Sequence, residues 1–344
     1  MFIQRRFSLL GMLAWTRKDV VFYIIVSTYP VCLYFFLDWH WLAIPTLPIT
    51  LMGIIVAFNV GFKNNNAYER LWEARKVWGA IVNTSRSWGI NSIDFVTNHF
   101  RGQNLEENEL HKIHTRLIYR HIAWLTALRY QLRKEKVWEH HNHKDQIRFR
   151  ERFHTSAEYK EGLDNAIAPF LSKDEKKDIL NRVNPAAQII KKQSEDLRKL
   201  RDENLMDDFR HVEMTALLND LYIQQGKSER IKNFPLPRQY ATISYLFVMI
   251  FIWVLPYAML SVFGEMTEQN GPYFIWLTIP ACVLVSWIFF TLEKVGDYSE
   301  NPFEGTGNDV PITSMSRGIE IDLRDMLNEK NLPLPIEPEN NILT

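Results

Sequence analysis

The chain has 344 residues, with 40 Lys or Arg and 40 Asp or Glu, so its formal net charge at pH 7 is zero. That balance, without an aromatic and basic platform, gives no reason to expect nucleic acid as a partner. The apolar residues cluster into four uncharged segments, each long enough to cross a hydrocarbon core of about 30 Å. These segments are residues 20–37, 42–62, 241–263 and 271–292.

The first residues of the chain do not resemble a signal peptide, and basic residues beside the first two spans predict how the chain is oriented in the membrane. Residues 1–15 lack the apolar core and small-residue cleavage site of a signal peptide, and we expect an amphipathic interfacial helix there. Basic residues flank the start of the first span and the end of the second, which places those ends in the cytosol. They are Arg5, Arg6, Arg17, Lys18, Lys63, Arg70, Arg75 and Lys76. Four spans then leave both termini and the polar middle inside.

The second span runs into a polar segment without a helix breaker, which predicts one helix reaching Ser87 or beyond. Ile54, Phe58 and Phe62 recur every four residues and stack on one face over about 12 Å. Apolar rings of this kind gate ions by dewetting. The adjacent face carries the small-residue series Gly53, Ala57 and Gly61, which allows close helix packing. From spacing alone, ordinary bundle packing is the commoner reason for both faces, because Ile and Phe at helical spacing usually belong to a core. The polar Asn59 suits either a neighbouring helix or a pore.

The polar middle predicts further helices. The expected ranges are 107–139, 172–183 with Ser172 as N-cap, and a helix starting at Pro185 that continues, after a short break, through 206–222. The segment KNFPLPR from Lys232 ends this region, because its prolines cannot continue a helix.

After the fourth span come a Gly/Pro-rich turn, a helix with apolar residues from Met315 to Leu327, and an extended tail. No strand pattern or internal repeat is found, so the fold class is all-α.

Nothing in the sequence indicates catalysis or a cofactor, since metalloprotease, phosphate-loop and nucleophile-elbow motifs are missing. The cysteines, Cys32 and Cys282, both lie in spans and indicate neither a disulfide nor a metal site. His140, His141 and His143 read as an exposed turn rather than metal ligands.

A crowded group follows the second span on the same helix. It comprises Tyr68, Arg70, Trp72, Glu73, Arg75 and Trp78. Its arginines and glutamates are spaced for local ion pairs. A helical junction between the membrane and cytosolic halves is one interpretation, and direct lining of an ion path is the other.

The stretch GFKNNNAYERLWEARKVWG from Gly61, the turn NPFEGTGND from Asn301 and the following MSRGIEIDLRDML resemble the prokaryotic branch of the bestrophin family. The resemblance covers nearly the whole chain. It implies a homopentameric ion channel of the inner membrane, with one pore on the five-fold axis. Its narrow neck corresponds to Ile54, Phe58 and Phe62 here, the stripe already singled out by its spacing.

The resemblance also implies a second constriction near the cytosolic exit, just upstream of the proline segment. Ile231 is the residue we expect there, ahead of Phe234. Animal members are calcium-activated anion channels whose calcium clasp is an acidic run after the NPF turn. Here Gly305, Thr306 and Gly307 dilute the oxygen ligands that calcium needs, so calcium activation is not expected to carry over.

The sequence therefore predicts a passive homopentameric channel in contact with membrane lipid and monovalent ions, not an enzyme. Cations are favoured, because prokaryotic members of the family resembling this chain are cation-permeable. An anion (chloride) channel of the same architecture and a membrane-anchored scaffold are the alternatives. The expected domains are 1–63 (interfacial helix and spans one and two), 64–238 (cytosolic helices), 239–294 (spans three and four) and 295–344 (turn, helix and tail).

Overall fold

The structure, a computed structural model, describes residues 1–6, 8–100, 105–139 and 157–344. These residues form helices and isolated β-bridges but no strand, which confirms the all-α prediction for the described part of the chain. They divide into two compact units. We call Gln4–Glu69 with Pro235–Glu300 the apolar unit, and Met1–Ile3, Arg70–Phe234 and Asn301–Thr344 the polar unit.

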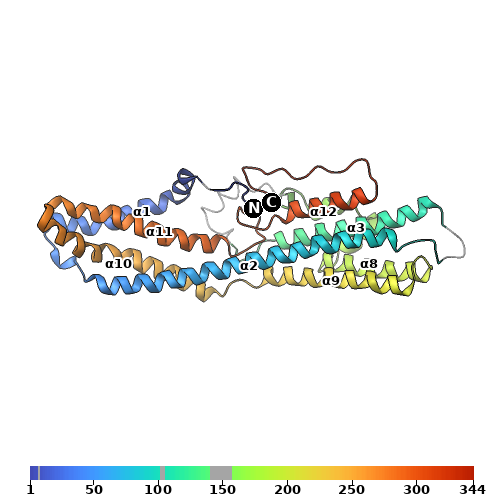
Figure 1. Cartoon of the computed structure of the whole chain (residues 1–344), viewed down its shortest axis with the longest axis horizontal. Helices are drawn as coiled ribbons and strands as arrows, with labels where there is room; N and C mark the ends of the chain where they lie inside the picture. Colours follow the sequence, from blue (N-terminus) through green and yellow to red (C-terminus); the bar gives the residue numbers. More distant parts are fainter. Residues whose placement is uncertain (7, 101–104, 140–156) are drawn as a thin grey trace. The chain divides into compact units, whose positions relative to one another are not determined.

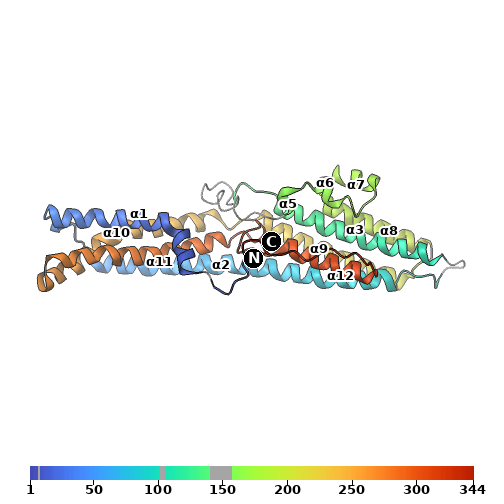
Figure 2. The same ribbon diagram turned by 90° about the horizontal axis from the view of Figure 1, so that it is seen from above.

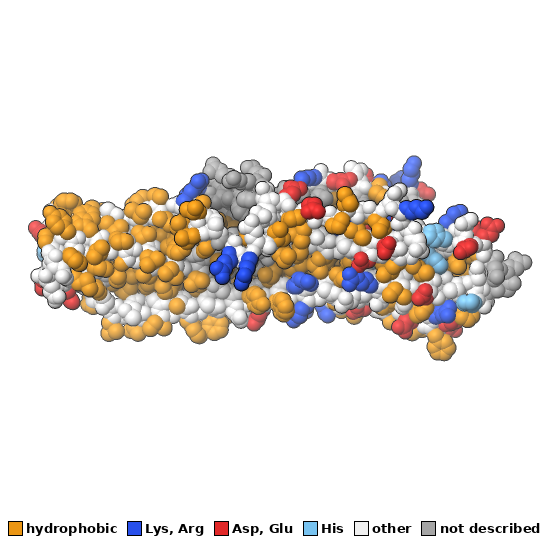
Figure 3. Space-filling view, turned by 45° about the horizontal axis from the view of Figure 1, so that its top comes forward, with side chains coloured by type: hydrophobic (Ala, Val, Ile, Leu, Met, Phe, Trp, Pro, Cys, Tyr) orange, Lys and Arg blue, Asp and Glu red, His pale blue; other side chains and the backbone are white. Residues whose placement is uncertain are grey.

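The apolar unit is a bundle of long helices (Figure 1). They are α1 (Leu9–Phe36), the first part of α2 (Thr46–Asp94), α10 (Arg238–Asn270) and α11 (Thr278–Tyr298), with the 3-10 turns η1 (His40–Leu42) and η3 (Pro272–Leu277). α11 packs against both α1 and α10. Four helical segments are long and apolar enough to cross a membrane, as many as the sequence predicts. Hydrophobic side chains cover much of this unit's visible surface, as a lipid environment requires (Figure 3).

The N-terminal segment differs from the prediction. From Leu9 onward, the stretch expected as a separate interfacial helix is the first part of α1 itself. Ser8 starts the helix, because its hydroxyl accepts a hydrogen bond from the Gly11 N–H at 3.0 Å. From there α1 continues as one helix to Phe36.

The polar unit contains the rest of α2 and seven further helices in its described part (Figure 2). They are α3 (Glu107–Arg133), α5 (Ala157–Lys160), α6 (Leu163–Ile167), α7 (Lys173–Leu180), α8 (Pro185–Asp202), α9 (Asp208–Asn233) and α12 (Ile312–Met326). Ser172 caps α7 and Pro185 begins α8, as predicted. α3 ends six residues before the predicted 139, because Lys134 is extended. α9 runs eleven residues past the predicted 222.

A large apolar core holds the polar unit together. Trp78, Trp88 and Trp124 are all buried in it. Close packing joins α2 to α12 at Gly89, where an added Cβ would lie 2.5 Å from Cδ2 of Leu323. Burial of such large side chains supplies most of the free energy that orders helices of this length.

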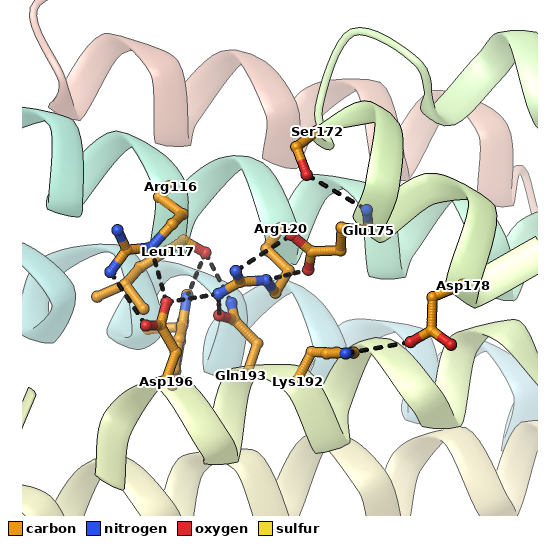
Figure 4. Close-up of polar contacts among 10 residues, drawn as sticks. Arg116, Leu117, Arg120, Ser172, Glu175, Asp178, Lys192, Gln193 and Asp196 are labelled. Atoms are coloured by element: carbon orange, nitrogen blue, oxygen red, sulfur yellow. Dashed lines mark hydrogen bonds and ion pairs between the residues drawn. The ribbon is translucent and has the colours of Figure 1, made fainter. Parts of the chain in front are cut away.

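An ion-pair cluster joins α3 to α7 and α8 (Figure 4). The Arg120 guanidinium, whose side chain is buried, donates to Glu175 at 2.5 Å and to Asp196 at 2.7 Å. Arg116 adds two hydrogen bonds to Asp196, at 2.8 and 3.0 Å. Gln193 accepts from Arg120 and donates to the Leu117 carbonyl, so each buried polar group is satisfied.

Candidate functional site

The predicted neck residues lie on one unburied face of α2. Ile54, Phe58 and Phe62 are 62, 68 and 55 % exposed in the single chain. The rings of Phe58 and Phe62 meet edge to face with centroids 4.4 Å apart, so the face forms a continuous apolar strip. Such exposure of bulky apolar side chains on a helix requires lipid, a second chain or a narrow apolar path beside it.

The opposite face of α2 packs inside the apolar unit. Val56 and Val60 are buried in a cluster with Phe251 of α10. Gly53 allows that contact, because a Cβ there would lie 3.2 Å from the Phe251 ring. A Cβ on Gly61 would meet nothing within 4 Å. The small-residue series therefore packs within the chain at Gly53 but not at Gly61.

The motif residues directly after Phe62 attach α2 to α11. The Lys63 ammonium is buried and forms an ion pair with Glu293, and it lies 3.6 Å from Asp297. The neighbouring Asn64 donates to the Leu292 carbonyl at 3.0 Å. A buried charge pair tolerates little displacement, so these contacts determine which face of α2 is turned away from the bundle.

The residues of the crowded group farther along α2 differ in their contacts and burial. In the polar unit, the Arg70 guanidinium donates to the carbonyl oxygens of Phe234 at 2.6 Å and Ile231 at 2.8 Å, at the end of α9. Glu73 pairs with Arg230 and Trp78 is buried. These contacts join α2 to α9 within the polar unit. Tyr68 and Trp72 have exposed side chains instead.

The two residues considered for the exit constriction differ in burial. Ile231 is 3 % exposed and belongs to the core of the polar unit, whereas Phe234 is 68 % exposed. The sequence did not distinguish them in this way, because both lie near a helix end beside prolines. Only contacts with distant helices decide which of the two side chains points inward.

In the NPF turn, the Asp309 carboxylate accepts several hydrogen bonds. Gly305 has φ +86°, a conformation that favours glycine, and its N–H donates to Asp309 at 2.5 Å. The buried Asp309 carboxylate also accepts from the Thr306 N–H at 3.0 Å and hydroxyl at 2.7 Å. The Arg133 guanidinium lies 3.8 Å from the same carboxylate. A calcium ion takes six to eight oxygen ligands, and it would have to displace these donors to bind Asp309.

A second buried pair, Lys232 with Glu139, lies in the polar unit. Burial raises the pKa of Glu139 above its usual value and lowers the pKa of Lys232, although each partner opposes the other's shift. The described residues contain no group of three or more His, Cys, Asp or Glu that could hold a metal. His140, His141 and His143 lie outside the described residues. Cys32 and Cys282 are both free thiols, and Asn59 is half-buried.

Comparison with known proteins points to one family. A model described as "Bacterial/Fungal Bestrophin protein" matches residues 7–325. The voltage-dependent anion channel-forming protein YneE of Escherichia coli is 26 % identical over 294 residues, which cover 86 % of this chain and 81 % of that protein. A protein with the same descriptive name from Ralstonia nicotianae is 28 % identical over 297 residues, covering 85 % of this chain and 82 % of its own.

The fold is also known from solved structures. A crystal structure of a bacterial bestrophin homologue from Klebsiella pneumoniae superposes with a TM-score of 0.72 at 21 % sequence identity. The match covers 91 % of this chain and 98 % of that one. At this identity the likeness establishes the fold alone.

Proposed function

Because the chain belongs to the bestrophin family of ion channels, we propose that it is a homopentameric, multi-pass inner-membrane channel that passively conducts monovalent ions. The neck of the pore is formed by Ile54, Phe58 and Phe62, and sodium and potassium pass in preference to chloride. The chain needs no cofactor for this. Its partners are four further copies of itself and the surrounding lipid.

The observation that carries the proposal is the exposed apolar face of α2. Its three bulky residues are more than half exposed, while Val56 and Val60 behind them are buried against α10. In a ring of identical subunits, this face supplies three stacked apolar collars. Collars of this kind thin the water around an ion without replacing it, so the barrier depends on their radius.

The proposed topology follows from the basic residues beside the spans. Both termini face the cytosol, together with residues 64–238 and 295–344. Residues 1–63 and 239–294 contain the membrane-spanning helices. The charged surface of the polar unit supports an aqueous location for it (Figure 3).

We propose Ile231 as the constriction at the cytosolic exit, and a comparison with Phe234 tests this assignment. The exposure of Phe234 makes it available to a water-filled path, whereas Ile231 would need to be uncovered first. Replacing each by Ala separates them, because only the constriction residue should change the rectification of the current.

A second candidate is an anion channel of the same architecture. The descriptive names of the Escherichia coli and Ralstonia nicotianae relatives state anion channel formation, which supports this alternative. The neck itself does not discriminate, because Ile and Phe carry no charge.

The test is a reversal potential in planar bilayers, with purified protein under a KCl gradient. A potential near the potassium equilibrium value supports the cation channel, and one near the chloride value supports the anion channel. No current under any gradient would contradict the proposed channel activity, although the family and its fold would still hold.

Widening the neck tests the pore residues. Single-channel current should rise when Ile54, Phe58 and Phe62 are all replaced by Ala, because the collars widen. Ile55→Ala is the matched control, since this isoleucine is equally exposed but about 100° around the helix. An unchanged current in the triple variant, with an intact oligomer on size-exclusion chromatography, contradicts the neck assignment.

A further inference from the structure

The charged side chains that follow the neck on α2 are not equivalent. Lys63 is buried in an ion pair with Glu293, so its charge is not open, meaning exposed and unpaired. Arg70 donates to carbonyl oxygens at the end of α9, and Glu73 pairs with Arg230. Three of the first four charges beyond Phe62 are therefore bound to partners within the chain.

Glu69 is the exception among these four. Its side chain is exposed, and no ion pair to it occurs in the described part of the chain. Asn65 donates from Nδ2 to Glu69 Oε1 at 3.0 Å, one turn closer to the neck. This hydrogen bond restrains the carboxylate along α2, and the side chain remains exposed to solvent.

Glu69 also lies on the neck face. It is seven residues beyond Phe62, which on an α-helix places it about 20° around the axis and about 10 Å further along. Asn65 lies between them on the same face. The next charged residue on this face is Glu73, about 16 Å beyond Phe62, and it pairs with Arg230. Lys76 follows it about 21 Å beyond Phe62, which exceeds two Debye lengths at physiological salt.

We propose that Glu69 is the specificity-determining residue of the channel, and that its carboxylate at the inner mouth of the neck favours cations over anions. The inference rests on the proposed function, because the neck must be the ion path. Apolar collars set the height of the barrier for either sign of charge. The sign preference then comes from the nearest open charge, and repeated carboxylates attract cations and repel anions.

The experiment compares K⁺/Cl⁻ permeability ratios from reversal potentials of wild type, Glu69→Gln, Glu69→Lys and Glu69→Asp. Glu69→Gln should lower the ratio at least about threefold at low salt, because a full charge near the ion is lost. Glu69→Lys should make the channel prefer chloride, and Glu69→Asp should keep the wild-type sign. The effect should shrink as ionic strength rises.

Asp94→Asn is the matched control. It removes the same charge from an exposed position on the same helix, about 37 Å further along, and should leave the ratio unchanged. If the wild type prefers cations and Glu69→Gln has the same permeability ratio, the inference about Glu69 is wrong and the proposed channel function is unaffected. Absence of current in wild type overturns the proposed function itself. An equal shift in Asp94→Asn also overturns the inference, since the effect would then follow total charge. If Glu69→Lys gives no current, the ratio in Glu69→Gln and Glu69→Asp still decides.

Discussion

Replacing Lys63 by Met is the sharpest test of how α2 is held against α11. Lys63 and Glu293 have side chains only 3 and 5 % exposed, and Asp297 lies 3.6 Å from the same ammonium. Without Lys63, Glu293 stays buried and faces a second carboxylate. Breaking a buried pair by removing one partner costs about 3–5 kcal/mol, and the second acid places this case toward the upper end.

The assay is thermal unfolding of the purified protein in detergent, followed by tryptophan fluorescence. A loss of this size should lower the unfolding midpoint by about 5–15 °C. The double variant Lys63→Met with Glu293→Met should recover most of the loss, because no uncompensated charge remains. The same single variant should also change the single-channel current, since α2 is no longer held against α11 next to Phe62.

Lys294→Met is the matched control. Lys294 lies on α11 beside Glu293 and pairs with Asp19 at 2.7 Å, but both side chains are more than a fifth exposed. Its loss should cost no more than about 1 kcal/mol. Equal midpoints for Lys63→Met and Lys294→Met would refute the reasoning, as would a double variant no more stable than the single one.

Three further outcomes concern the polar unit. Arg120→Met should lower the free energy of unfolding by about 3–5 kcal/mol, because the carboxylates of Glu175 on α7 and Asp196 on α8 lose this buried cation. Burial alone raises the pKa of Asp196, but hydrogen bonds from its arginines outweigh burial and leave the pKa below its usual value. The ionised Asp196 therefore contributes its full stabilisation of the fold above the unfolded-state pKa of about 3.9, and this contribution is lost as the pH falls through the lower folded-state pKa. Thermal melting curves of Asp196→Asn should lack this loss of stability at low pH. Gly89→Leu should cost about 1–3 kcal/mol by overpacking against Leu323, and expose α12 to protease. Gly226→Leu should cause neither this loss of stability nor this exposure, because a Cβ on Gly226 would meet nothing within 4 Å.

Local patterns in the sequence were sufficient for much of the fold. The four apolar segments, the continuity of α2 past Phe62, the Ser172 cap and the Pro185 helix start were all predicted and are confirmed. Each depends on residues within a turn or two of one another, where helix period, capping and hydropathy act directly. The family was likewise recognisable from short motifs, and the comparisons confirm it.

Helix ends were less predictable for a physical reason. The expected interfacial helix merges with α1, and α9 continues well beyond residue 222. Neither end is marked by a proline or glycine at the predicted position. Packing against neighbouring helices then decides how far each helix extends.

The sequence by itself determined the helical class, the spans and the apolar stripe of Ile54, Phe58 and Phe62, because these depend on periodicity along one helix. Only the tertiary structure decided which charges are bound and which are open. Lys63 meets Glu293 across 230 residues, and Arg70 meets the Phe234 carbonyl across 164. Such pairs form when separate helices pack at one register, which no local pattern encodes. In the described part of the chain, that packing gives Lys63, Arg70 and Glu73 partners and leaves Glu69 exposed without an ion pair.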